Sequence, residues 1–429
     1  MPFFSIVIPV YGTADHLPRA VELLQHQKFS DWEAVIVDDG SPDNARQVIA
    51  DLASRDSRIV PVFHDHNQGT HLARGAGAAR ASGQWVLFLD ADDELAAGSL
   101  EQLAQEISER PCDVLHFGAE IVGIDMPLET VAVIAKLSNT DFPALSGQEI
   151  VESSFIKPDG ERQDWHVWQR VYRAELVRKA FERMEKLRLV HGEDAYEWLV
   201  IASLAQVEHF ANHIRGYRYF LGRGVTTFAH VAAEQFVQLA DAHAQTLAAA
   251  EKWAVEFQGF SLTPCVAGLR ERTIELLAGD WYVRVAAADK ELTMRHMVKL
   301  FGAVQIAGEL MRLVRDTAYA DWDHGRGLNL EAEYLTWYRW AVDLANGHKP
   351  TERLRVFREV AERHLRDLAH RSGVPAPVIE ADTVEGLHSG WHKHSEQCGK
   401  RRNGWLVHVS RLVRVPQKIL RAVRRLFSR

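Results

Sequence analysis

Acidic side chains follow two short apolar runs near the start of the chain. Asp90 and Asp92 come directly after residues 85–89, and Asp38 and Asp39 follow the second apolar run of the sequence. Carboxylate oxygens are ligands that Mg²⁺ and Mn²⁺ prefer, and Mg²⁺ is often held by one or two carboxylates together with substrate phosphates. The D-x-D spacing therefore indicates a divalent-cation site, with helix N-capping as the structural alternative.

A second candidate for chemistry is the acidic pair Glu193-Asp194 at the start of 193–204, a segment with helical character. A carboxylate beside a substrate hydroxyl can accept its proton in the transition state, an effect worth about 10²–10⁴-fold in rate. Acidic residues are also favoured in the first turn of a helix, because the backbone dipole is positive there. The pair alone fits both interpretations.

The segments that must position these residues alternate between strand and helix patterns. Short apolar runs predict strands, and longer amphipathic stretches predict helices between them. The predicted strands are 4–10, 33–37, 58–63, 85–89 and 113–117, and the predicted helices are 13–26, 43–54, 68–81 and 98–109. This order indicates βαβ units in an α/β fold with a mostly parallel sheet. Ligands of such sheets bind at the carboxyl ends of strands, so both acidic clusters are expected at one edge.

The rest of the sequence changes character twice. Residues 126–165 show no clear period; beyond them, 167–172 and 216–221 have strand patterns, and 174–181 has a helical pattern. Strand signals then end, and apolar residues recur at helical spacing in 232–257, 291–314 and 353–370. We predict an α/β domain over 1–228, an α-helical domain over 229–387 and a basic tail over 388–429.

Composition excludes several classes of protein. The 429 residues are 47% hydrophobic and 25% charged, which is typical of globular chains. No apolar stretch reaches the roughly 20 residues that span a bilayer, and residues 1–20 do not look like a secretion signal. Three distant cysteines, Cys112, Cys265 and Cys398, do not predict a disulfide framework. These features predict a cytoplasmic protein.

Charge is distributed unevenly along the chain. The formal net charge is −8, yet residues 400–429 hold ten Lys or Arg and no acid, so this tail carries +10 and the remainder −18. An acidic body argues against nucleic-acid binding. On a helix, 409–427 has an apolar face opposite a basic face, which predicts attachment of 405–429 to an anionic membrane surface, the inner face of the cell membrane. The alternative is docking on the acidic helical domain or on another subunit of a homo-oligomer.

The motifs are more specific in combination than singly. In chain order they are Ser5-Ile6-Val7-Ile8-Pro9-Val10-Tyr11, Val37-Asp38-Asp39-Gly40-Ser41, Asn67-x-Gly69, Ala73-Arg74, Gly83-x-Trp85, Phe88-Leu89-Asp90-Ala91-Asp92-Asp93, Val167-Trp168-Gln169-Arg170-Val171-Tyr172 and His191-Gly192-Glu193-Asp194. This series resembles the family 2 glycosyltransferases, inverting enzymes that use nucleotide-sugars and have a GT-A fold with a Rossmann-like nucleotide-binding domain. The resemblance covers residues 3–228 and implies a nucleotide-sugar half over 1–125 and an acceptor half over 126–228.

The resemblance also implies roles for individual residues. On the donor side, it implies that Pro9 and Tyr11 flank the nucleoside base, Asp39 accepts a hydrogen bond from it, Asp38 supports that turn or the ribose, Arg74 contacts the diphosphate or sugar, and Asp90 contacts ribose or sugar hydroxyls next to Ala91. It further implies that Asp92 binds the metal, that Asp93 assists Asp90 or Asp92, that Asp194 is the general base, and that Trp168 and Glu193 lie on the acceptor side.

Three departures from the family pattern concern details of the donor sugar and the acceptor. The family often has Asn where this chain has Gly12 and Gly75, and its Trp-Asn-Lys-like segment is Trp168-Gln169-Arg170 here. The reaction type does not depend on these positions.

The implied activity is transfer of a sugar from a UDP-sugar to a hydroxyl of a cell-surface glycan or lipid-linked precursor, assisted by Mg²⁺ or Mn²⁺. One alternative is a degenerate, membrane-associated scaffold of polysaccharide assembly. The joint presence of Asp39, Asp90, Asp92 and Asp194 argues against it. A second alternative, a sugar nucleotidyltransferase, is disfavoured because no glycine-rich phosphate loop with a basic residue follows the first strand.

Overall fold

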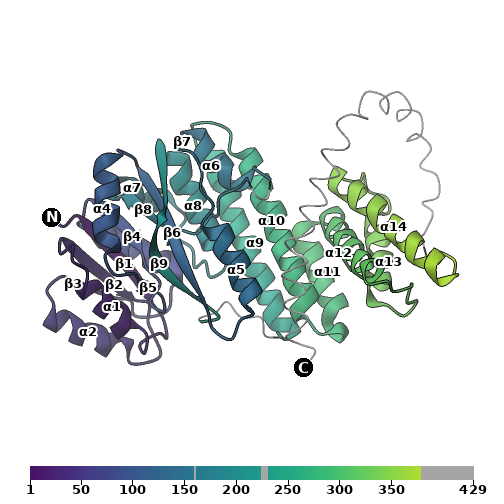
Figure 1. The fold of residues 1–429 in the computed structure, drawn as a ribbon, viewed down its shortest axis with the longest axis horizontal. Coiled ribbons are helices and arrows are strands. Elements are labelled where there is room, and N and C mark those ends of the chain that lie inside the picture. The colour runs from purple at the N-terminus through teal and green to yellow at the C-terminus, as the bar shows by residue number, and fades with distance from the viewer. Residues whose placement is uncertain (159–160, 224–229, 378–429) are drawn as a thin grey trace. The chain divides into compact units, whose positions relative to one another are not determined.

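The computed structural model describes residues 1–158, 161–223 and 230–377 (Figure 1). The chain divides into a unit of Met1–Thr227 with Asp241–Thr273, and a unit of Phe228–Ala240 with Ile274–Arg429. The predicted domain boundaries at 228 and 387 stay predictions. The tail, with the predicted membrane-binding stretch 405–429, lies outside the described residues.

The first unit is built on a nine-stranded sheet. Its order is β3-β2-β1-β4-β8-β6-β9-β5, and β7 pairs with β9. The strands are β1 (Phe4–Val10), β2 (Trp32–Asp38), β3 (Ile59–Phe63), β4 (Trp85–Phe88), β5 (Glu94–Leu95), β6 (Val114–Gly123), β7 (Leu145–Ser146), β8 (Arg170–Arg173) and β9 (Val207–Leu221). The half formed by β3, β2, β1 and β4 is parallel, β8 is antiparallel to both of its neighbours, and β6 pairs with β9 in parallel. The predicted α/β class is confirmed.

Helices connect and cover these strands in the first unit. They are α1 (Leu17–Gln25), α2 (Ala45–Arg55), α3 (Thr70–Arg80), α4 (Ser99–Glu109), α5 (Leu128–Ser138), α6 (Gln148–Phe155), α7 (Ala174–Arg183) and α8 (Glu193–Leu204). Two of them, α5 and α6, occupy the stretch 126–165 that shows no clear period. In α5, apolar residues point both inward and outward: Val131 and Ile134 pack on the core, whereas Leu128 and Leu137 are exposed.

Parallel strands bring the candidate site residues to one edge of the sheet. β1 lies between β2 and β4, so the residues after all three strands share the carboxyl edge. Helix α3 approaches this sheet closely through Gly77, where an added Cβ would lie 2.3 Å from Cγ1 of Val7. The close approach fixes Arg74, about one turn earlier in α3, relative to that edge.

Helices make up the described part of the second unit, and α9 (Ala233–Glu256) and α10 (Thr263–Arg284) contribute to both units. The further helices are α11 (Lys290–Phe301), α12 (Ala303–Asp323), α13 (Glu333–Ala345) and α14 (Glu352–Ser372). Gly302, with φ of 96°, ends α11 and splits the predicted helical segment 291–314 in two. In α12, the buried Glu309 is paired with Arg312 at 2.6 Å and with Arg353 of α14 at 2.7 Å. Within the described ranges, no helix combines the length and apolar character needed to cross a membrane.

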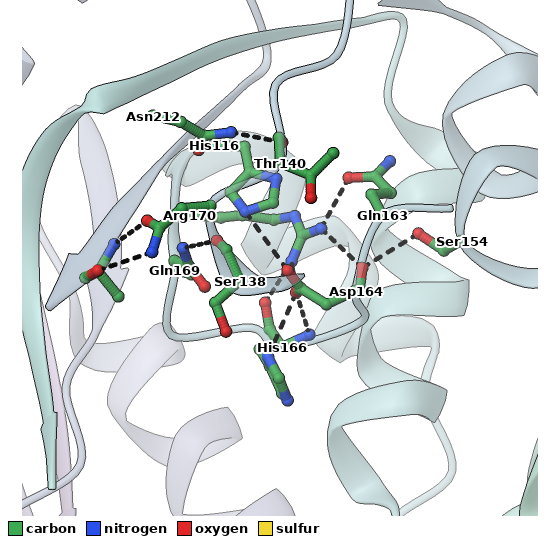
Figure 2. Close-up of polar contacts among 12 residues, drawn as sticks. His116, Ser138, Thr140, Ser154, Gln163, Asp164, His166, Gln169, Arg170 and Asn212 are labelled. Carbon is green, nitrogen blue, oxygen red and sulfur yellow. Dashed lines mark hydrogen bonds and ion pairs between the residues drawn. The ribbon is translucent and has the colours of Figure 1, made fainter. Parts of the chain in front are cut away.

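A buried polar network supports the middle of the sheet (Figure 2). The fully buried guanidinium of Arg170 in β8 donates to Asp164 Oδ1 at 3.1 Å, to Gln163 Oε1 at 2.8 Å and to Glu208 Oε1 of β9 at 3.2 Å. His116 of β6 faces Asp164 at 3.6 Å, and among the described residues neither of its ring nitrogens has a hydrogen-bond partner. Burial, reinforced by the charge of Arg170, lowers the pKa of His116 to about 3.

The low pKa of His116 predicts that the folded protein loses stability as the pH falls from about 6.5 toward 3. The unfolded chain takes up a proton at the ordinary histidine pKa while the folded chain does not, which costs up to about 1.4 kcal/mol per pH unit. We expect H116F to remove this part of the loss. Urea unfolding at steps between pH 7 and pH 4 measures the difference between the two proteins. A difference that does not change with pH would contradict the assignment.

Candidate active site

The turn after β4 carries three acids in different environments. Asp93 is buried: it accepts hydrogen bonds from the hydroxyl of Tyr217 at 2.9 Å and from the backbone N–H of Phe220 at 2.9 Å. Burial, together with repulsion from Asp90, raises the pKa of Asp93 to about 8. The two donors come from β9, so that strand holds the turn in place.

Arg74 occupies the centre of the site. Its Nη2 donates to Asp90 Oδ1 at 3.2 Å, and its Nη1 donates to Asp194 and, at 3.0 Å, to Glu197 Oε2. Only 3% of the arginine side chain is exposed. The structure thus brings together three residues predicted from sequence, Arg74, Asp90 and Asp194, which come from α3, the end of β4 and the start of α8.

The charges around Arg74 change the acidity of its neighbours. Burial alone lowers the pKa of Arg74, but the carboxylates of Asp194, Glu197 and Asp90 outweigh it and place this pKa well above its ordinary value. Burial raises the pKa of Asp90 to about 6 even though Arg74 opposes the shift. Burial and the adjacent Asp194 carboxylate also raise the pKa of Glu193. Three carboxylates, those of Asp90, Asp194 and Glu197, thus contact one arginine.

The start of α8 presents the acidic pair predicted from sequence. Gly192, with φ of 73°, precedes the helix, and Glu193 and Asp194 form its first turn. The side chain of Asp194 is 20% exposed, so a substrate hydroxyl could reach it. Asp194 thus lies in the first turn of a helix and also contacts Arg74, so its position fits both the structural and the catalytic interpretation of the acidic pair.

Two residues of the cluster, His71 and Glu197, are missing from the sequence-based prediction. Glu197 is fully buried and accepts a 2.8 Å contact from Nδ1 of His71, while Nε2 of the same ring lies 3.0 Å from the backbone oxygen of Glu185. For Glu197, the sequence does hold a signal in its spacing. It lies three residues after Asp194 in a predicted helix, which places both side chains on the same helix face.

Asp38 and Asp39 anchor loops at the carboxyl edge. Asp38 accepts the backbone N–H of Ser41 at 2.9 Å. Asp39 is buried and accepts the backbone N–H groups of Gln68 at 2.9 Å and Gly69 at 2.7 Å, with His64 Nδ1 at 2.7 Å from the same carboxylate. The Asp39 contacts fix the turn that leads into α3, and thereby the start of the helix that carries Arg74.

The remaining predicted residues lie around this edge. Tyr11 follows β1 and is 52% exposed, so its ring is free to stack on a base; Pro9 is half-buried and Ala91 is buried. Trp168 is buried, with its ring 5.1 Å from that of Tyr219 at an interplanar angle of 5° and 4.4 Å from that of Tyr217. Trp168 therefore supports Tyr217, the residue that holds Asp93, and its acceptor-side role stays a prediction.

The residues fit a divalent cation that is completed by a ligand. The described ranges contain no group of three or more His, Cys, Asp or Glu side chains placed to hold one metal ion. Asp92, however, is only half-buried, and its carboxylate has no hydrogen bond or ion pair to any residue that the structure describes. It lies beside Asp90 and Asp93 in the turn after β4, and burial is the main cause of the raised pKa values of those two acids. One or two carboxylates are enough for Mg²⁺ when substrate phosphates supply further oxygens.

Comparisons with known proteins find glycosyltransferases. Residues 5–132 match the model of Glycosyl transferase family 2. The chain is 30% identical over 186 residues to the uncharacterized glycosyltransferase EpsJ of Bacillus subtilis, covering 42% of this chain and 50% of EpsJ. It is 36% identical over 110 residues to the Campylobacter jejuni GalNAc(5)-diNAcBac-PP-undecaprenol beta-1,3-glucosyltransferase, covering 25% of this chain and 36% of that enzyme. The chain thus spans half or less of the length of these curated relatives.

The solved structures that match this chain are more distant in sequence. The crystal structure of S. aureus TarS 1-349 in complex with UDP-GlcNAc is 17% identical and has a TM-score of 0.45, covering 76% of this chain and 93% of that chain. The mannosyltransferase PcManGT from Pyrobaculum calidifontis, in complex with GDP-Man and Mn²⁺, is 14% identical with a TM-score of 0.44, covering 83% and 87%.

The contacts of Asp39 predict a structural effect of its substitution without any nucleotide. In D39N the amide NH₂ would face backbone N–H donors, so we expect a loss of about 1–3 kcal/mol in the free energy of unfolding. The control is D65N, which changes an exposed carboxylate in the neighbouring loop. Urea unfolding of the ligand-free proteins compares them. Equal stability of D39N and wild type would mean that Asp39 acts only on a bound ligand.

Proposed function

We propose, from the membership of residues 5–132 in glycosyl transferase family 2, that this protein transfers a sugar from a nucleotide-sugar to a hydroxyl group of an acceptor. The observation that carries the proposal is the bridge by Arg74 between Asp90, after β4, and Asp194, at the start of α8. The buried guanidinium of Arg74 thus contacts both Asp90, the candidate donor-binding acid, and Asp194, the candidate proton acceptor.

The proposed donor is a UDP-sugar. The exposed ring of Tyr11 after β1 is available to stack on the base, next to Pro9. Asp39 and Asp38 shape the neighbouring turn, so that the base would bind between this turn and β1. Asp90 and Ala91 would face the ribose or sugar. The TarS complex with UDP-GlcNAc and the PcManGT complex with GDP-Man hold different nucleotides, so the base is a question for experiment.

The proposed reaction is a single displacement with inversion at the anomeric carbon. The acceptor oxygen forms the new bond to that carbon while the bond to the diphosphate oxygen breaks. Asp194 takes the proton of the attacking hydroxyl, since a carboxylate can act as a general base. Its side chain is partly exposed at the start of α8, where an acceptor could reach it. Because one displacement needs one base, the site requires no second carboxylate nucleophile.

Asp92 is the residue proposed to hold Mg²⁺ or Mn²⁺. The bound cation would supply positive charge beside the departing nucleoside diphosphate. Asp90 and Asp93 flank this position, and the hydrogen bonds of Asp93 to β9 keep the turn in place. Arg223 also donates to the backbone oxygen of Asp92 at 3.3 Å.

The proposed acceptor is a cell-surface glycan or a lipid-linked precursor. Support comes from the name of the Campylobacter jejuni relative, which acts on an undecaprenol-linked glycan, and from the basic amphipathic sequence of 405–429. A protein attached to an anionic membrane by this tail would meet a lipid-linked acceptor there, on the inner face of the cell membrane.

Nucleotide binding tests the donor site. We expect UDP with Mn²⁺ to raise the thermal unfolding midpoint of the wild type, because a ligand that binds only the folded state stabilises it by RT ln(1 + [L]/Kd), about 2.7 kcal/mol at 100-fold excess over Kd. D92N should lose the Mn²⁺-dependent part of the shift. E101Q, a change at an exposed carboxylate in α4, should keep it.

The same panel, extended to GDP, CDP and dTDP, decides among the alternatives. A shift with another nucleoside diphosphate keeps the transferase and changes the donor. Release of pyrophosphate from a nucleoside triphosphate and a sugar phosphate would indicate a nucleotidyltransferase. No shift with any nucleotide would leave the assembly scaffold as the remaining function.

The tail predicts membrane attachment that is separable from donor binding. We expect the full chain to float with liposomes containing anionic lipid, and a chain ending at Ser389 to stay in solution. Neutral liposomes are the control. Equal flotation of both chains would remove the tail as the attachment site, and flotation of neither would remove the membrane proposal.

A further inference from the structure

We propose that Glu197 and His71 are positioning residues, which hold the guanidinium of Arg74 so that it joins Asp90 to Asp194. The consequence for turnover rests on the proposed function, in which Asp194 accepts the proton. The placement of Arg74 itself rests on the geometry of α3 and α8.

The four side chains form a row in which each contact joins opposite charges or a donor and an acceptor. His71 Nδ1 lies 2.8 Å from Glu197 Oε1, Glu197 Oε2 lies 3.0 Å from Arg74 Nη1, and the same Nη1 contacts Asp194. His71, Arg74 and Glu197 are buried, whereas Asp194 is partly exposed. The row therefore runs from the interior to the surface and ends on the candidate base.

His71 is held by polar contacts at both ring nitrogens and by two neighbouring aromatic rings. Both ring nitrogens face oxygen acceptors, the Glu197 carboxylate and the backbone oxygen of Glu185, so both contacts are hydrogen bonds when both nitrogens carry protons. The ring of Phe181 stacks on it at 5.8 Å, and that of Tyr196 lies 5.7 Å away. A ring held this firmly gives Glu197 one orientation.

Glu197 in turn decides where Arg74 points. Glu197 and Asp194 lie three residues apart in α8, so one guanidinium nitrogen can contact both. Arg74 Nε is buried without a hydrogen-bond partner among the described residues, so the contacts at Nη1 and Nη2 alone orient the group. Without the Glu197 carboxylate, only Asp194 and Asp90 would orient the guanidinium, and the contact that fixes it from the interior would be lost.

An isosteric change removes the negative charge from this row. In E197Q the amide oxygen keeps the Arg74 contact only when the NH₂ faces His71 Nδ1, which must then accept rather than donate, so the ion pair with Arg74 becomes a neutral hydrogen bond. Glu208 offers a matched control, because its carboxylate is also fully buried between an arginine, Arg170 Nε at 3.2 Å, and a second donor, Gln163 Nε2 at 2.9 Å. E208Q removes the charge that pairs with Arg170, a residue of the network in Figure 2, and among the described residues Glu208 has no hydrogen bond or ion pair with Arg74, Asp90 or Asp194.

The test measures UDP released from UDP-GlcNAc and from UDP-glucose by the full chain with Mn²⁺. We expect E197Q to lower kcat at least tenfold with the KM for the donor within about twofold, since the interaction with the base matters in the transition state. E197D, which keeps the charge on a shorter side chain, should recover part of the rate. E208Q should keep the wild-type kcat. Equal losses of kcat in E197Q and E208Q would overturn the proposal.

Unfolding supplies a measurement that does not need activity. We expect R74Q and E197Q each to lower the urea midpoint, and the double variant to lower it by less than the sum, because the two residues interact directly. Where R74Q fails to fold, R74K takes its place. Additive losses would overturn the placement of Arg74 by Glu197. If the wild type releases no UDP from either donor, the proposed use of these UDP-sugars fails, and this coupling alone then supports or overturns the positioning.

Discussion

The buried charge of Arg74 is the constraint around which the site is built. Moving a guanidinium out of water is costly unless carboxylates and hydrogen bonds replace the lost solvation. Here the compensation comes from Asp90 after β4 and from Asp194 and Glu197 on α8. These contacts are possible only if α3 lies close to β1, as Gly77 allows, and if Asp39 holds the loop that leads into α3. One ion pair cluster thus links a helix, a strand end and a second helix that are far apart in sequence.

The acidic turn after β4 depends on support from the other half of the sheet. Tyr217 of β9 reaches Asp93 with its hydroxyl, and the ring of Trp168 packs on the ring of Tyr217. Arg170 of β8 contacts Glu208 near the start of β9, at the other end of that strand from Tyr217. Strand β8, antiparallel to both of its neighbours, lies between β4 of the parallel half and β6, which pairs with β9.

Much of this arrangement is predictable from sequence because it is local. The runs that form β1, β2 and β4 are continuous and apolar, and the parallel order of these strands puts the following acids at one edge. The pairing of Glu197 with His71 was not predicted because it joins positions 126 residues apart, and the helical spacing that links Glu197 to Asp194 does not indicate this distant partner. The N-terminal part of β9 escaped because polar residues, Glu208 and Asn212 among them, interrupt its apolar pattern, and their partners lie elsewhere in the fold.

The excess of carboxylates explains why donor and cation binding should depend on each other. Asp90, Asp194 and Glu197 contact one buried arginine, Asp92 and Asp93 follow Asp90 in the same turn, and burial raises the pKa values of Asp90 and Asp93. Under the proposed function, a nucleoside diphosphate would add further negative charge to this edge, so a cation beside it would favour its binding. A cation on Asp92 would need oxygen ligands beyond those of the described residues, which form no group of three or more metal-ligating side chains, and the phosphates would supply them. Each ligand would then raise the affinity for the other by the same factor, as thermodynamic linkage requires.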